Sequence, residues 1–211
     1  VGRTGSGKSS IINILMRFYA YQSGRILIDG QPLEQLSEEE LRQHVGLVLQ
    51  DSFLFTGTVA DNIRLFDSSI SFDRVEAAAK FVQADGFINQ LDQQYDSPVA
   101  ERGATFSAGE RQLISFARTM ARDPKILILD EATSSIDTET EEKVQVALER
   151  MRQGRTTIAI AHRLSTIQDA DLILVLHQGE VIEQGNHQEL IAQDGLYKKM
   201  YQLQSGHVTV S

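Results

Sequence analysis

The sequence opens on Val1 and then reads Gly2-Arg3-Thr4-Gly5-Ser6-Gly7-Lys8-Ser9, which meets the phosphate-loop pattern Gly-x-x-x-x-Gly-Lys-Ser at every position. In such a loop the glycines let backbone N–H groups converge on phosphate oxygens, and the next helix presents its positive N-terminus. Lys8 would neutralise charge on the β- and γ-phosphates, and Ser9 would bind Mg²⁺. A flexible Gly/Ser turn is the alternative, but this match leads directly into a helical pattern. The predicted phosphate-binding residues are Gly2, Arg3, Thr4, Gly5, Ser6, Gly7, Lys8, Ser9 and Ser10.

Helical and strand patterns alternate after the loop. Apolar residues at helical spacing predict helices, and short apolar runs between turn residues predict strands. The helices are expected over residues 8–19, 108–122 and 138–151, with a helical region over 61–91, and the strands over 24–30, 45–50, 125–130, 156–161, 172–176 and 181–183. This alternation predicts an α/β fold of the P-loop NTPase type, with a mainly parallel central sheet covered by helices and an inserted helical subdomain.

The expected organisation is one ATPase domain over residues 1–211. Residues 1–52 and 124–211 would form the nucleotide-binding core, and residues from about 53 to 123 a helical lobe. A phosphate loop should follow a buried strand, and no such strand precedes Gly2. We therefore expect an N-terminally truncated domain that lacks its first β-strands.

Composition narrows the class of partner. A formal net charge of −9 argues against nucleic acid, because binding to a nucleic-acid backbone relies on Lys and Arg. Absence of cysteine excludes disulfides and thiolate chemistry, and it is compatible with a reducing compartment. The longest apolar run, Leu172 to Leu176, is far shorter than the roughly 20 residues of a membrane-spanning helix.

Polar residues at predicted strand ends are the candidate catalytic groups. Asp130 closes an apolar strand, where ligands of α/β sheets bind, and could hold Mg²⁺. Glu131 follows it and could deprotonate the attacking water. Gln50 ends another strand and could reach Mg²⁺ or the water, and His162 ends a third and could bond the γ-phosphate. Each alone is compatible with a structural role; their conjunction with the phosphate loop favours ATP hydrolysis.

The order of these elements resembles the nucleotide-binding domain of ATP-binding-cassette transporters. After the loop come Gln50, Phe106-Ser107-Ala108-Gly109-Glu110-Arg111-Gln112, Asp130-Glu131, Ser134-Ser-Ile-Asp137 and His162. The resemblance covers residues 1 to about 204. It implies that two domains sandwich two ATP molecules, each bound by the phosphate loop of one domain and the signature sequence of the other. Ser107, Gly109 and Asp137 would then contact nucleotide across the interface.

Two further segments resemble the exporter branch of this family. They are Phe55-Thr-Gly-Thr-Val-Ala-Asp-Asn-Ile63 and Val99-Ala-Glu101-Arg102-Gly103. In exporters the membrane domain is fused N-terminally, and the segment around Glu101 lies near its coupling helices. The resemblance thus implies a domain on the cytoplasmic face of a membrane, tethered through transmembrane helices.

The signature sequence departs from the family pattern. Ala108 replaces the first of two usual glycines, and Glu110 stands where Gln is commonest. A methyl group and a carboxylate near the phosphate would weaken this half of a site, whereas Gln50, Asp130, Glu131 and His162 are all present. We therefore expect a heterodimeric exporter in which the weakened signature serves a degenerate site.

Three other classes of protein are alternatives to an exporter. A non-transport cassette protein, such as a translation or DNA-repair switch, is the main alternative, but coiled-coil heptads and a basic surface balance are missing from this sequence. A GTPase would need Asn-Lys-x-Asp to bind guanine, and a nucleotide kinase would need an arginine-rich lid. The sequence contains no sign of either.

Overall fold

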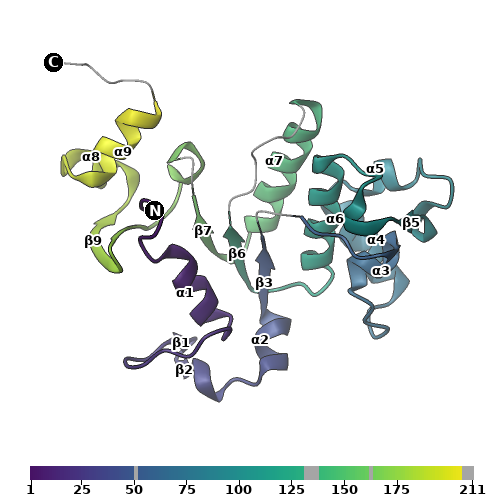
Figure 1. The fold of residues 1–211 in the computed structure, drawn as a ribbon, viewed down its shortest axis with the longest axis horizontal. Coiled ribbons are helices and arrows are strands. Elements are labelled where there is room, and N and C mark those ends of the chain that lie inside the picture. Colours follow the sequence, from purple (N-terminus) through teal and green to yellow (C-terminus); the bar gives the residue numbers. More distant parts are fainter. Residues whose placement is uncertain (50–51, 131–137, 162–163, 206–211) are drawn as a thin grey trace. The chain divides into compact units, whose positions relative to one another are not determined.

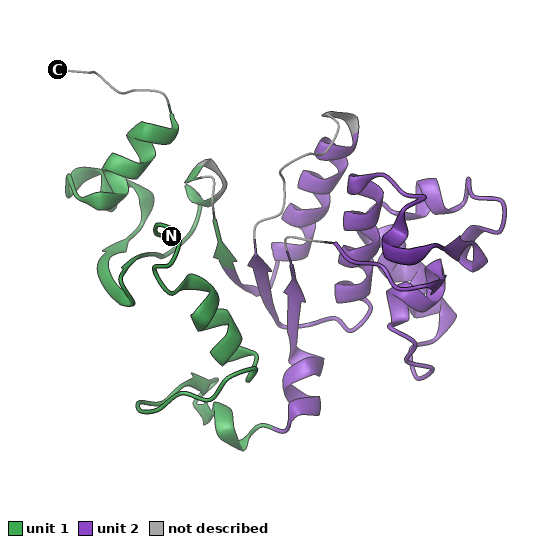
Figure 2. Ribbon diagram, in the orientation of Figure 1, with its two compact units in different colours: residues 1–36, 159–211 green, residues 37–158 purple. Residues whose placement is uncertain are grey.

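A computed structural model describes residues 1–49, 52–130, 138–161 and 164–205 (Figure 1). Contacts divide the chain into two compact units: residues 1–36 with 159–211, and residues 37–158 (Figure 2). The core and lobe expected with boundaries at residues 52 and 124 follow a different division and stay a prediction. Among the described residues, no helix combines the length and the hydrophobicity needed to cross a bilayer.

The unit of residues 37–158 is built on the central sheet. Its strands β3 (Val45–Val48), β6 (Ile126–Asp130) and β7 (Thr156–Ile160) lie in the order β3-β6-β7, and the last two residues of β7 fall outside the unit. β3 and β6 are parallel, with Val45 opposite Ile126 and Val48 opposite Leu129. Strands that are covered on both faces have continuous apolar sequences, and β6 contains such a run in Ile-Leu-Ile-Leu. The predicted parallel sheet is confirmed.

Helices supply the rest of this unit. They are α2 (Glu38–His44), α3 (Val59–Arg64), α4 (Phe72–Phe81), α5 (Asp85–Ile88), α6 (Ala108–Met120) and α7 (Thr138–Arg152), with short 3₁₀ turns at Gln94–Asp96 and Glu101–Gly103. Two-residue strands β4 (Gly57–Thr58) and β5 (Pro98–Val99) pair antiparallel. The helical region expected over 61–91 is confirmed as helical, but it is broken into three helices because Leu65, Phe66 and Gln83 adopt positive φ.

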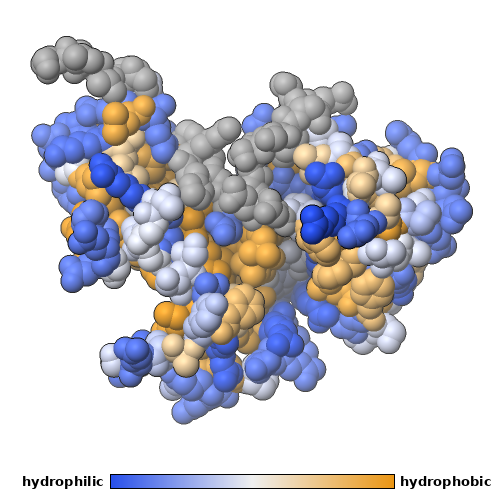
Figure 3. Space-filling model, in the orientation of Figure 1, coloured by the Kyte–Doolittle hydropathy of each residue, from blue (hydrophilic) through white to orange (hydrophobic). Residues whose placement is uncertain are grey.

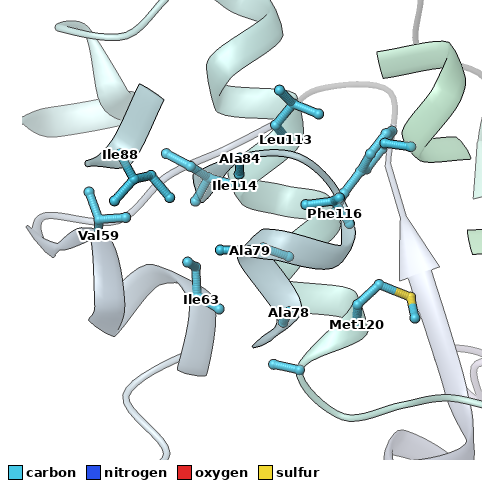
Figure 4. Packing of buried hydrophobic residues seen from close by; sticks show 14 of the residues in the cluster. Val59, Ile63, Ala78, Ala79, Ala84, Ile88, Leu113, Ile114, Phe116 and Met120 are labelled. Carbon is cyan, nitrogen blue, oxygen red and sulfur yellow. The ribbon is translucent and has the colours of Figure 1, made fainter. Parts of the chain in front are cut away.

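One hydrophobic cluster holds α3, α4, α5 and α6 together. Figure 4 shows Val59 and Ile63 of α3 facing Ala79 of α4 and Ile114 of α6. Phe116 on α6 is completely buried. Burying a side chain of this size contributes about 1.5–3 kcal/mol, so α6 is a main source of the unit's stability.

The other unit contains the phosphate loop. Its elements are α1 (Lys8–Leu15), β1 (Leu27–Ile28), β2 (Gln31–Pro32), a 3₁₀ turn at Leu33–Gln35, another at Leu164–Ile167, β8 (Ile173–His177), β9 (Glu180–Gly185), α8 (His187–Ala192) and α9 (Leu196–Gln204). β8 and β9 form an antiparallel hairpin, whose turn at Gln178 and Gly179 uses two left-handed residues. The strand-turn-strand pattern predicted here is confirmed.

Two local predictions in this unit were wrong in extent. The helix expected over residues 8–19 ends at Leu15, because Arg17 takes a left-handed conformation with φ of 57°. The strand expected over 24–30 is a small antiparallel hairpin of β1 and β2, since Asp29 and Gly30 turn the chain with positive φ. Both places show turn chemistry that overrides the apolar pattern.

Candidate nucleotide-binding site

The phosphate loop is held against the β8–β9 hairpin. Leu176 donates its backbone N–H to the Val1 carbonyl at 2.8 Å, and Gly2 forms a parallel bridge with Leu176. Further along, Gly179 donates to the Ser6 carbonyl at 3.1 Å. A Cβ at Gly2, where φ is 152°, would collide with the Leu176 carbonyl and lie 2.6 Å from Ser6 Oγ. Only glycine therefore fits the entry to the loop.

The N-terminus of α1 points its backbone N–H groups into this loop. Gly7, the residue before the helix, is left-handed with φ of 102°, and no side chain within the described residues caps the helix start. Lys8, Ser9 and Ser10 form the first turn, and both serines are exposed. Uncapped N–H groups at a helix N-terminus form a site for an anion.

Lys8 spans the loop. Its ammonium group donates to the Gly2 carbonyl at 2.7 Å and to the Arg3 carbonyl at 3.0 Å, and it lies 3.5 Å from Ser6 Oγ. These bonds place a positive charge inside the ring of backbone formed by the loop. The sequence predicted the charge at this position, whereas its carbonyl partners could not be read from the pattern.

A cavity of about 490 Å³ lies beside the start of the loop, in the same unit. Its lining residues are Gly2, Arg3, Thr4, Ala161, Leu164, Met200 and Gln204. The α9 helix is fixed on this side, since Gln204 Oε1 accepts the Leu164 backbone N–H at 2.8 Å. The loop is thus accessible along Arg3 and Thr4, which are exposed.

Asp130 lies in the other unit, where the sequence predicted it. It is the last residue of β6, half-buried, at the carboxyl end of a strand that runs parallel to β3. The carboxyl ends of parallel strands form the edge at which α/β proteins bind ligands. Four predicted site residues lie outside the described residues: Gln50, Glu131, Asp137 and His162.

The signature residues begin α6. Ser107 is its N-cap: Ser107 Oγ accepts the Glu110 N–H at 3.2 Å, and the Glu110 carboxylate accepts the Ser107 N–H at 2.8 Å. This reciprocal capping box gives Glu110 a structural role in starting α6. Ser107 is exposed, and Gly109 is buried in the first turn.

The two exporter-like segments lie together. Gly57 pairs with Val99 and Thr58 with Pro98 in the β4–β5 ladder. A Cβ at Gly103, where φ is 69°, would lie 2.9 Å from Leu54 Cδ1. Segments far apart in the sequence are thus in contact with each other.

Comparison with known proteins identifies the family. The sequence model described as "ABC transporter" matches residues 1–134. The chain therefore belongs to the ABC transporter family.

Similar proteins narrow the identification from the family to an ATP-binding domain of the exporter type. The chain is 62% identical over 98% of its length to "Putative ABC transporter ATP-binding protein exp8" of Streptococcus pneumoniae, and covers 35% of that protein. It is 48% identical over 98% of its length to the "ATP-dependent lipid A-core flippase" of Aliivibrio fischeri, covering 36%. A bacterial Atm1-family ABC exporter with ATP bound superposes with a TM-score of 0.87 at 45% identity, with the chain fully covered and 36% of the exporter matched. The chain spans about a third of each of these proteins.

Proposed function

We propose that this domain binds and hydrolyses MgATP, and that hydrolysis powers export by transmembrane segments of a longer protein. The observation that carries the proposal is the arrangement of residues 2–9, where the Lys8 ammonium lies inside a backbone ring at the uncapped start of α1. Triphosphate oxygens are the ligands that such a ring accommodates. The transporter names of the relatives support the same function, and none of them favours the alternative of a translation or DNA-repair switch.

Residues for Mg²⁺ are available in the chain. Ser9 in the first turn of α1, Asp130 at the end of β6, and Gln50 would hold the cation. Hydroxyl, carboxylate and amide oxygens are hard ligands, so this donor set fits Mg²⁺. When bound, the cation would neutralise charge on the β- and γ-phosphates.

The remaining catalytic roles follow from chemistry. Glu131 would accept a proton from the water that attacks the γ-phosphorus, as the bond to the ADP oxygen breaks and phosphate leaves. His162 would hydrogen-bond the γ-phosphate, and Gln50 would orient the water. Lys8 would exchange its bonds to the Gly2 and Arg3 carbonyls for phosphate oxygens.

A second nucleotide-binding domain is the proposed partner. Ser107 is exposed at the start of α6, which suits contact with a nucleotide bound to another domain, and Gly109 and Asp137 would complete that contact. Ala108 and Glu110 favour a heterodimer, in which the signature of this chain serves the weaker site. The full-length subunit alone should then hydrolyse ATP more slowly than a mixed pair with its partner. Equal turnover by the homodimer would refute the heterodimer.

The transmembrane part would dock on the region formed by the exporter-like segments, at the cytoplasmic face of the membrane. Large apolar side chains are exposed at Phe55 of the first segment and at its neighbours in sequence, Phe53, Leu65 and Phe66, and the Phe55 ring contacts those of Phe53 and Phe66. Figure 3 shows apolar surface over the helical part of the unit of residues 37–158. An apolar patch of this kind suits a protein partner.

The hydrolysis itself is tested with purified full-length protein. We expect Mg²⁺-dependent release of phosphate from ATP, and we expect Asp130→Asn to raise the Mg²⁺ concentration needed for half-maximal rate. Hydrolysis that is independent of Mg²⁺, or unaffected by Asp130→Asn, would exclude the roles given above.

A further inference from the structure

Arg118, near the end of α6, has partners that the proposed function does not use. Its guanidinium donates from Nε to the Asn62 carbonyl at 2.8 Å, from Nη1 to the Phe53 carbonyl at 3.0 Å and from Nη2 to Asn62 Oδ1 at 3.1 Å. It also lies 5.5 Å from the centre of the Phe55 ring. These partners are neutral oxygens and a ring face. A cation is thus bonded to backbone outside its own helix.

Asn62 completes the arrangement. It is completely buried on α3, and its amide group bonds both backbone groups of Phe55: Oδ1 accepts the N–H at 2.8 Å and Nδ2 donates to the carbonyl at 2.8 Å. Nδ2 also donates to the Thr58 carbonyl at 3.0 Å. The segment of residues 53–55 is therefore held by two side chains. Loss of Asn62 would leave the partly buried backbone groups of Phe55 without these bonds, and loss of Arg118 would do the same to the partly buried Asn62 carbonyl, which is costly.

The segment of residues 53–55 matters because it lies close in sequence to Gln50, which has a catalytic role in the proposed function. Phe53 follows Gln50 by three residues, and β3 ends two residues before Gln50. The next residue on α6, Thr119, donates its hydroxyl to the Leu47 carbonyl of β3 at 3.4 Å. A Cβ on Gly46 would lie 2.6 Å from Thr119 Cγ2, so α6 packs closely on β3. Consecutive residues of α6 thus contact the chain on both sides of Gln50.

We infer that Arg118 is a positioning residue, which ties the backbone after Gln50 to α6, the helix that Ser107 caps. A shift of α6 is thereby transmitted to residues 53–55, and the reverse also holds. The charge persists at neutral pH, because burial lowers the pKa of Arg118 only to about 10. The inference rests on the proposed function for its catalytic consequence, and on the described contacts for the positioning itself.

Hydrogen exchange tests the positioning without any activity measurement. In the full-length protein, Arg118→Met keeps the aliphatic stem and removes the donors. Exchange of the backbone amides in residues 52–56 should accelerate about tenfold or more, as expected when a local hydrogen-bond network is opened. Arg122→Met, which breaks the ion pair of Arg122 with Asp67 at 2.7 Å, is the matched control and should leave this segment unchanged. Unchanged exchange in Arg118→Met would overturn the inference.

A double-mutant cycle tests the catalytic consequence. In Arg118→Met, turnover per bound nucleotide should fall about tenfold relative to wild type, while KM for ATP should stay within about twofold. In a protein that already carries Gln50→Ala, adding Arg118→Met should lower turnover by no more than about twofold further. A purely structural role would lower the amount of folded protein but not turnover per bound nucleotide. An equal loss in both backgrounds, or no loss in either, would overturn the inference. If Arg118→Met does not bind nucleotide, Arg118→Lys takes its place, since a single ammonium cannot replace three directed donors.

Wild type and Glu131→Gln are measured alongside. Absence of Glu131-dependent hydrolysis would refute the proposed function, whereas the exchange result would still decide whether Arg118 positions residues 53–55.

Discussion

At the scale of single residues, the proposed phosphate site relies on few side chains. Most of the groups proposed to bind phosphate are backbone N–H groups, and Gly5 and Gly7 allow the left-handed conformations of that backbone. Lys8 supplies the charge, and in this structure it is bonded to two carbonyls of the same loop. The phosphate oxygens of a nucleotide must therefore compete with these two carbonyls for Lys8. The affinity depends on the difference in free energy between the bonds of Lys8 to phosphate and its bonds to the carbonyls.

Lys8→Met should weaken ATP binding by about 10- to 100-fold, since a hydrogen bond to a charged group contributes about 1.5–3 kcal/mol. Titration with a fluorescent ATP analogue measures the affinity. Lys125→Met is the control, because Lys125 is an exposed lysine paired with Asp123 and far from the loop in sequence. Equal affinities for wild type and Lys8→Met would be inconsistent with the site described.

At the scale of elements, sequence patterns predicted the sheet strands, α6 and α7 to within a few residues. They failed where a local turn interrupted an apolar pattern, as at Arg17 and at Asp29. They also missed α2, although the capping box of Ser37 and Glu40 marks its start. Asn62 lies in the exporter-like segment, but the sequence did not indicate its structural role: it is completely buried on α3, and only its hydrogen-bond partners reveal what it does.

The start of α9 depends on a carboxylate from another element. Glu183 on β9 accepts the backbone N–H of Leu196, and that of Tyr197 at 3.0 Å. A Cβ on Gly195 would lie 2.6 Å from Glu183 Cδ. Gly195→Ala should therefore displace the carboxylate and cost about 1–2 kcal/mol of unfolding free energy, the size of a lost helix cap.

Urea unfolding of the 211-residue chain measures this cost. The matched control is Gly86→Ala, because a Cβ at Gly86 within α5 meets no atom within 4 Å. It should leave stability unchanged or raise it by about 0.5–1 kcal/mol, as helical alanine does relative to glycine. A similar loss in both variants would show that the close approach to Glu183 is unimportant.

Asp123, in the turn after α6, should make the free energy of unfolding depend on pH in the acidic range. Its bond from Arg155 at 2.8 Å holds the pKa of the Asp123 carboxyl below its ordinary value. A lowered pKa in the folded state contributes stability that is present above the ordinary value of about 3.9 and is lost as pH falls through the folded pKa.

Asp123→Asn, which also tolerates the left-handed backbone found there, should therefore be less stable than wild type at about pH 6, and the difference should shrink towards about pH 3. The effect should be small, because the side chain is 45% exposed. Unfolding free energies at the two pH values measure it, and a difference independent of pH would contradict the assignment.

At the scale of the whole molecule, the chain is compared with much longer relatives. It spans about a third of the transporters it resembles, and it belongs to the ABC transporter family by sequence and by fold. Motif order predicted the family correctly, and the described motif residues lie at a loop, a strand end and a helix start, as at Lys8, Asp130 and Ser107. Patterns of this kind do not encode the contacts of Arg118, which depend on how three elements pack.

We propose that the domain hydrolyses ATP with Glu131 as the base, in a site completed by a second domain. The most direct test is Glu131→Gln in the full-length transporter, measured as ATP turnover and as retained nucleotide. We predict that ATP still binds and stays trapped in a closed dimer, while turnover falls by about 10²–10⁴-fold, the usual contribution of a general base. Unchanged turnover would contradict the account.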